Sequence, residues 1–146
     1  MKLFKFQQDG LGIDLGTSNS IISDENGKII INEPSVVAID INNYEIVAVG
    51  TEAKSMIGKT PDNIVAISPI ENGVIADFES TVSMLSYFIK KARPNFSVFQ
   101  PEVCVSVSAS LTDVERRSVE DLALNAGARS VKLVEENSPA LKVLRV

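Results

Sequence analysis

The sequence contains no histidine and only one cysteine in its 146 residues. The lack of histidine excludes histidine-based acid–base catalysis and histidine metal ligands. The single cysteine, Cys104, excludes an internal disulfide and fits a reducing compartment. Because Cys104 lies in the apolar run 103–107, we expect a small buried hydrophobic residue rather than a nucleophile.

Long hydrophobic runs and an excess of positive charge are also missing. No stretch is long and apolar enough to span a bilayer. Asp9 and Gly10 interrupt the N-terminal apolar residues too early for a signal peptide. With 19 acidic and 14 basic residues, the net charge is −5, which argues against a nucleic-acid partner because phosphate backbones favour clustered Lys and Arg.

What is present is the composition of a globular domain, 45% hydrophobic and 23% charged. In the first half, short apolar segments alternate with turn residues and predict strands. We expect these strands over residues 11–15, 20–23, 28–32, 36–41, 45–49 and 64–67. Asn26-Gly27 predicts a hairpin turn, and residues 51–57 predict a short helix that ends at Gly58.

Two amphipathic helices are predicted in the second half. The first covers residues 82–92 and ends before Pro94. The second begins at the capping box Thr112-Asp113-Val114-Glu115 and ends at Gly127. Strands expected at 103–107 and 131–134 bracket this helix and imply a parallel βαβ unit. The expected inner face of the second helix is Val114, Ser118, Leu122 and Ala126, flanked by Val119 and Ala123.

The stretch from Asp14 to Asn19 carries the clearest chemistry. An apolar strand delivers an acidic residue, and a glycine, a hydroxyl and an amide follow. We expect Gly16 to let the backbone come close to a ligand and to adopt a positive φ. Thr17 could donate to phosphate oxygens, and Asp14 could face a hydrated Mg²⁺. A hairpin turn with only backbone roles explains the same residues.

Residues 12–20, Gly-Ile-Asp-Leu-Gly-Thr-Ser-Asn-Ser, resemble the first phosphate motif of the actin-like ATPase superfamily. Further blocks resemble the MreB-type bacterial actins in particular, and they occur in that family's order between about residue 10 and residue 136. They are Asn-Glu-Pro-Ser-Val-Val-Ala-Ile at 32–39, Val-Gly-Thr-Glu-Ala-Lys at 49–54, Gly-Lys-Thr-Pro at 58–61, Gly-Val-Ile-Ala-Asp-Phe at 73–78 and Gly-Ala-Arg at 127–129. Each block is weak alone, but their ordered occurrence is specific.

The resemblance implies an α/β fold, the N-terminal domain of an actin-like ATPase with a ribonuclease H-like mixed sheet and flanking helices. Residues 1–32 and 71–146 would form the larger subdomain with the first phosphate loop. Residues 33–70 would form a small inserted α+β subdomain. The family binds ATP with Mg²⁺ between two halves and polymerises into double filaments.

Matched residue by residue, the resemblance makes Asp14 the metal-side aspartate. It makes Gly16, Thr17, Ser18 and Asn19 the first phosphate loop. The family's catalytic glutamate corresponds best to Glu136 in Glu-Glu-Asn-Ser-Pro at 135–139, where the family's proline is displaced. Two carboxylates on a solvated strand end are the alternative interpretation of this segment.

Membrane contact is also implied, because MreB-type proteins insert a small apolar loop beside an N-terminal anchor. Phe4 and Phe6 would belong to the anchor, and Val98 and Phe99 to the loop. From the residues alone, a frayed terminus and a loop buried against a neighbouring element remain alternatives. The expected location is cytoplasmic, at the inner membrane face. The expected partners are a full-length filament or further copies, the membrane, and the wall-synthesis and shape machinery.

The family's second phosphate loop and adenosine-binding glycine motif do not appear in these 146 residues. We therefore expect one wall of an ATP–Mg²⁺ cleft, weak nucleotide binding and no measurable ATPase activity by this chain alone. The favoured interpretation is a truncated or partial MreB-like filament protein. The alternatives are a fragment of a chaperone ATPase or sugar kinase, and a non-catalytic module that docks on or caps a filament.

Overall fold

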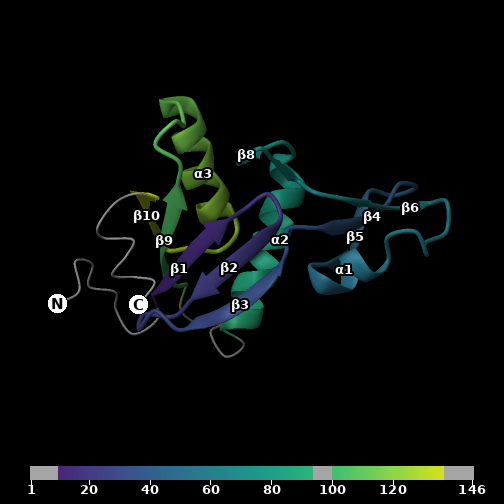
Figure 1. Ribbon diagram of the computed structural model, residues 1–146, viewed down its shortest axis with the longest axis horizontal. Helices are drawn as coiled ribbons and strands as arrows, with labels where there is room; N and C mark the ends of the chain where they lie inside the picture. Colours follow the sequence, from purple (N-terminus) through teal and green to yellow (C-terminus); the bar gives the residue numbers. More distant parts are fainter. Residues whose placement is uncertain (1–9, 94–99, 137–146) are drawn as a thin grey trace.

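The computed structural model describes residues 10–93 and 100–136. Within these residues, five strands form one mixed sheet in the order β10-β9-β1-β2-β3 (Figure 1). Strands β1, β2 and β3 are antiparallel neighbours, whereas β1 pairs with β9, and β9 with β10, in parallel. The strands are β1 (Leu11–Leu15), β2 (Asn19–Ser23), β3 (Ile29–Pro34), β9 (Glu102–Val107) and β10 (Ser130–Glu135).

A smaller antiparallel sheet lies at the other end of the molecule, in the order β5-β4-β6. A short helix, α1 (Thr51–Ser55), contacts β4 and β5 of this sheet. A two-stranded hairpin of β7 (Ile70–Glu71) and β8 (Val74–Ile75) follows it in the chain. The strands of the smaller sheet are β4 (Val37–Asp40), β5 (Glu45–Val49) and β6 (Ile64–Ile67).

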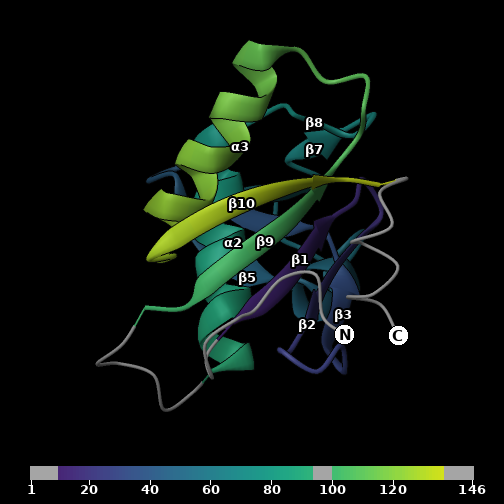
Figure 2. The ribbon, with the colours of Figure 1, turned by 90° about the vertical axis from the view of Figure 1, so that its left-hand side faces the viewer.

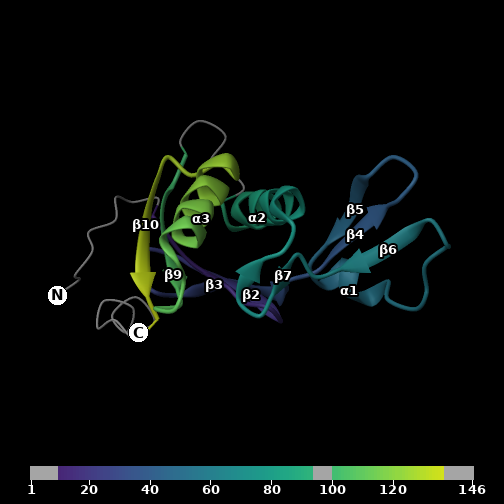
Figure 3. The same ribbon diagram turned by 90° about the horizontal axis from the view of Figure 1, so that it is seen from above.

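Two longer helices, α2 (Phe78–Ala92) and α3 (Asp113–Asn125), lie side by side on one face of the large sheet (Figure 3). Helix α2 contacts β2, β3 and β5, and α3 contacts β10. The side chains of Leu11 and Ile13 both point toward these helices, and they share a core with Phe88 and Leu122. Alternation along β1 therefore leaves Gly12 and Asp14 on the opposite face of the sheet.

Most predicted elements are confirmed within a few residues, including the parallel βαβ unit formed by β9, α3 and β10. The capping box at Thr112 is present, with the Glu115 N–H donating to Thr112 Oγ1 at 3.2 Å. Helix α2 starts earlier than expected because the Asp77 carboxylate caps it by accepting from the Ser80 N–H. The hairpin of β7 and β8 was not predicted as strands.

The predicted inner face of α3 is wrong at its start, because Val114 is 80% exposed. The buried residues of α3 and its C-cap are Val119, Leu122, Ala123 and Ala126. The division into subdomains at residues 33 and 70 stays a prediction. In the part of the chain that the structure describes, no helix has both the length and the apolar character needed to cross a membrane.

Candidate functional site

A cavity of about 240 Å³ lies where the parallel strands β1, β9 and β10 end. The carboxyl ends of parallel strands meet at one edge of a sheet, which is where open α/β sheets bind ligands. Figure 2 shows the three strands side by side, running toward this edge. Its polar lining comes from β1, from β9, from Glu136 directly after β10, and from Thr17 and Gly73 in two loops.

Asp14 stands near the end of β1, one residue before the strand finishes. It pairs with Ser106 of β9 on one side and with Ile21 of β2 on the other. Residues paired across neighbouring parallel strands point to the same face, so the side chains of Asp14 and Ser106 share one wall of the cavity. The strand places a half-buried carboxylate here, on the face away from the helices.

Gly16 begins the turn between β1 and β2, and its N–H donates to the Asn19 carbonyl at 2.9 Å. A Cβ atom at this position would lie only 2.6 Å from that carbonyl oxygen. Glycine is needed because the turn closes tightly on itself. The expectation of a positive φ was wrong, because Gly16 is absent from the described residues with positive φ.

Ser35, just after β3, stabilises the turn through two hydrogen bonds. Its hydroxyl donates to the Gly16 carbonyl at 2.6 Å, and its N–H donates to the Ser18 carbonyl at 2.9 Å. The buried hydroxyl of Ser20 lies 2.8 Å from that of Ser35. These bonds occupy the carbonyls of Gly16 and Ser18 and fix the shape of the turn.

Thr17 is hydrogen-bonded to the loop between β7 and β8 and to Ser68, which precedes β7. The Gly73 N–H donates to Thr17 Oγ1 at 2.9 Å, and the Ser68 hydroxyl donates to the Thr17 carbonyl at 3.2 Å. The Thr17 hydroxyl is the acceptor in the first bond, so its own proton remains available to a phosphate oxygen. The hairpin therefore holds Thr17 at the rim of the cavity.

Two of the predicted phosphate-loop residues lie elsewhere. Ser18 and Asn19 are exposed and do not line the cavity. The Asn19 amide donates to Asn32 Oδ1 at 2.9 Å, which joins β2 to β3. Thus the fold places Gly16 and Thr17 at the cavity, and Ser18 and Asn19 beside it.

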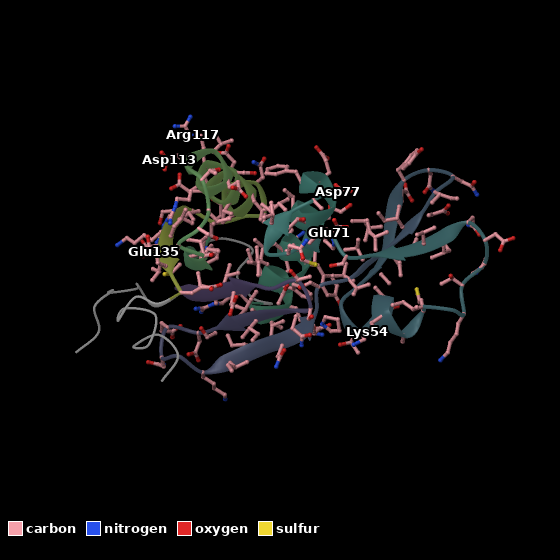
Figure 4. The ribbon with its side chains drawn as sticks, turned by 45° about the horizontal axis from the view of Figure 1, so that its top comes forward. Lys54, Glu71, Asp77, Asp113, Arg117 and Glu135 are labelled. Atoms are coloured by element: carbon pink, nitrogen blue, oxygen red, sulfur yellow. The ribbon has the colours of Figure 1, made fainter. Side chains whose placement is uncertain are left out.

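Glu136 follows β10 directly and also lines the cavity. Its N–H donates to the Val107 carbonyl at 2.9 Å, which extends the ladder between β9 and β10 by one bond. The neighbouring Glu135 pairs instead with Arg116 of α3 at 3.2 Å. Figure 4 shows Glu135 on the β10 side, away from Lys54 on α1. The two adjacent carboxylates thus have different surroundings, and Glu136 is the one that shares a cavity with Asp14.

Ser106 lines the cavity but was not predicted from the sequence, and neither were Gly73 and Ser108. Ser106 is 8% exposed, and its hydroxyl finds no hydrogen-bond partner in the described part of the chain. A buried hydroxyl without a partner is costly and unusual. The available signal was a lone serine in the apolar run 103–107; its register with Asp14 comes from the pairing of β1 with β9 in the structure.

The cavity suits a hydrated Mg²⁺ better than a metal caged by protein. Among residues 10–93 and 100–136, no group of three or more acidic or cysteine residues could hold a metal ion. Mg²⁺ commonly uses one or two carboxylates, several waters and substrate phosphates. Asp14, Glu136 and the unpartnered Ser106 hydroxyl fit this need for groups that contact water.

Cys104 lies two residues before Ser106 in β9 and is 2% exposed. Burial raises the pKa of its thiol to about 11, although Lys132 acts in the opposite direction. The thiolate is therefore scarce at neutral pH, and Cys104 is a buried apolar residue, as predicted.

The predicted membrane-contact residues Phe4, Phe6, Val98 and Phe99 lie outside the described residues.

Solved structures define the class of this fold. The crystal structure of MreB5 of Spiroplasma citri bound to ADP matches with a TM-score of 0.76 at 28% identity, covering 87% of this chain and 38% of that one. The MamK double helical filament matches with a TM-score of 0.71 over 87% of this chain and 40% of that one; at 22% identity it shows the fold alone. The domain has the fold of the actin-like ATPases.

The family follows from the sequence comparisons. The model of the MreB/Mbl protein family matches residues 8–141, so the chain belongs to that family. It is 47% identical over 126 residues to the cell shape-determining protein Mbl of Bacillus cereus, and 50% identical over 131 residues to MreB of Haemophilus influenzae. Each alignment covers 86% of this chain but only 38% or 37% of the relative.

Proposed function

We propose that this chain carries the phosphate- and cation-binding wall of an ATP–Mg²⁺ cleft in an MreB-like cell shape-determining filament protein. The observation that carries the proposal is the cavity at the carboxyl edge of β1, β9 and β10, which gathers Asp14, Thr17 and Glu136. Support for the nucleotide comes from MreB5, whose structures are described as bound to ADP and to AMPPNP.

Each residue has a distinct role in this proposal. Thr17 donates its hydroxyl proton to a phosphate oxygen while it accepts from Gly73. Asp14 accepts hydrogen bonds from the water molecules that surround the cation. The cation, when bound, neutralises phosphate charge. Glu136 accepts from the water that attacks the terminal phosphate, as the family resemblance implies.

The filament and membrane roles extend the proposal to the whole protein. The relatives carry the name "cell shape-determining", and one structural neighbour is described as a double helical filament. We propose that the parent protein assembles with further copies at the inner face of the cell membrane, together with the wall-synthesis machinery. Phe4, Phe6, Val98 and Phe99 are the proposed membrane contacts.

The test is a titration of the isotope-labelled chain with Mg²⁺ and ADP, in which the NMR chemical shifts of the backbone amides are measured. We expect shifts at residues 14–17, 73, 106–108 and 136, with a Kd on the order of 1 mM, because the contacts proposed for this chain are to phosphate and cation. Asp14→Asn keeps the side-chain shape and should weaken binding about tenfold by removing a charge-assisted hydrogen bond.

Asp24→Asn is the matched control. Asp24 caps the β2–β3 turn by accepting from the N–H groups of Asn26 and Lys28, away from the cavity. It should bind Mg²⁺ and ADP as the unaltered chain does. Shifts confined to surface acidic residues, or equal binding by Asp14→Asn, would contradict the proposed site.

A further inference from the structure

Ser106 presents a chemical problem that the proposed roles of Asp14, Thr17 and Glu136 do not address. Its hydroxyl is buried in the wall of the cavity and has no hydrogen-bond partner among the described residues. Leaving such a group unpaired costs free energy that a hydrophobic residue of similar size would not. Between Val103 and Val107 every other residue of the strand is apolar, so the serine is the exception in that stretch.

The position of Ser106 indicates what its partner is. Ser106 stands opposite Asp14 in the parallel pairing of β1 and β9, and opposite Val134 in the pairing of β9 and β10. Asp14 is therefore the acidic neighbour on the same face of the sheet. A ligand group that bonds the hydroxyl from the cavity must also lie within reach of the Asp14 carboxylate.

The neighbouring serine gives an internal comparison. Ser108 lines the same cavity two residues later, but its hydroxyl lies 2.8 Å from that of Ser110 and accepts from the Ser110 N–H at 3.2 Å. Its hydrogen-bonding needs are met within the loop. Of these two serines, Ser106 is the one whose hydroxyl depends on a group that enters the cavity.

We propose that Ser106 is a positioning residue for the hydrated cation at Asp14. Its hydroxyl hydrogen-bonds a water molecule in the cation's first hydration shell, while the Asp14 carboxylate accepts from other waters of the same shell. This arrangement suits Mg²⁺, which gives up its waters reluctantly. The inference rests on the proposed function, because it requires a cation in this cavity.

The experiment uses Mn²⁺ with ADP as the probe, since bound Mn²⁺ broadens the NMR signals of nearby amides. In the unaltered chain, broadening should centre on residues 14 and 106. Ser106→Ala should weaken Mn²⁺–ADP binding about fivefold, the loss expected for one hydrogen bond. Ser106→Thr keeps the hydroxyl and should retain most of the affinity, and Ser108→Ala should retain all of it.

Thermal unfolding without cation supplies a second readout. Because the hydroxyl has no partner to lose among residues 10–93 and 100–136, Ser106→Ala should leave the Tm unchanged or raise it by about 2–4 °C. Saturating Mn²⁺ and ADP should then stabilise the unaltered chain more than the variant. A purely structural serine would instead lower the Tm when it is removed in the absence of cation.

The outcomes separate the two proposals. Broadening around residue 14 with equal affinity in Ser106→Ala would overturn the role of Ser106 and leave the proposed function standing. The same holds if Ser106→Ala loses stability without cation. Absence of broadening near residue 14 in the unaltered chain would overturn both.

Discussion

At the residue scale, Glu33 joins the two sheets through a small, partly buried network. It lies in β3 and is 8% exposed. Its carboxylate pairs with Lys91 of α2 at 2.6 Å and accepts from the Thr51 N–H at 3.1 Å, at the first residue of α1. One side chain thus connects the large sheet, the long helix and the smaller sheet's helix.

The same carboxylate explains a glycine. Gly50 precedes α1 with φ 68° and ψ −133°, a conformation that is largely restricted to glycine. A Cβ atom there would collide with the Glu33 carboxylate. The close approach of Gly50 and Glu33 is therefore required for the Thr51 N–H to reach its acceptor.

We expect Glu33→Gln to lower the free energy of unfolding by about 1–2 kcal/mol at pH 7. The amide oxygen can still accept from Thr51, but the ion pair is lost. Lys91 is half-exposed, so solvent screens the pair and limits its contribution. Urea unfolding of both chains measures the difference, and Lys90→Met, a neighbouring exposed lysine, is the control.

The pH dependence of stability follows from the same group. Burial acts to raise the pKa of Glu33, but the hydrogen bonds from Lys91 and Thr51 outweigh it and hold the pKa below its ordinary value of 4.5. A carboxylate with a lowered pKa stabilises the fold above the unfolded pKa and loses that contribution as pH falls through the folded pKa. The gap between Glu33→Gln and the unaltered chain should shrink below about pH 4.5; a constant gap would contradict this account.

At the element scale, α3 shows why a correct helix prediction can still select the wrong face. Residues four apart drift by about 40° around a helix that turns about 100° per residue. Val114 and Ala126 are therefore separated by about 120°, too far to belong to one narrow buried stripe. The buried residues Val119, Leu122, Ala123 and Ala126 fall within about 100° of one another.

The capping box of α3 makes a second prediction. Thr112→Ala removes the acceptor for the Glu115 N–H at the exposed start of the helix. We expect the free energy of unfolding to fall by about 1 kcal/mol. Thr112→Ser should keep most of the original stability, because serine caps a helix equally well. Chemical denaturation measures both, and a loss of similar size in Thr112→Ser would rule out capping as the cause.

At the scale of the whole molecule, the two sheets are packed unequally. The large sheet and its helices enclose a core with Leu11, Ile22, Leu85 and Phe88, all fully buried. The smaller sheet contributes Val37 and Val49 to this core, and together with α1 it forms a separate cluster of Ala38, Ala48 and Ala53. Alanines bury little apolar area, so that end gains less hydrophobic stabilisation.

We expect the smaller sheet to open at a lower free energy than the large one. Amide hydrogen exchange should be faster for β4, β5 and β6 than for β1 and β9, because local opening follows the density of buried apolar contacts. Exchange measured by mass spectrometry on peptides from each sheet tests this. Equal protection of the two sheets would mean that they unfold as one cooperative unit.

Much of this could be predicted from sequence alone, for a physical reason. Strand periodicity, the turn residues around Gly16 and Gly27, and the capping box are local signals, since each acts within a few residues. The ordered sequence motifs predicted the family, and the comparisons confirm that prediction. The short strands β7 and β8 escaped because two residues give no periodicity.

Tertiary structure decided which groups meet. The pairing of β1 with β9 brings Asp14 beside Ser106 across more than 90 residues of chain. The hairpin loop at Gly73 comes back to bind Thr17, and the ladder to Val107 places Glu136 at the same cavity. Local sequence was enough for the tight turn at Gly16 and for the family, because those depend on neighbouring residues. The cavity depends on strand register, which only the packed sheet defines.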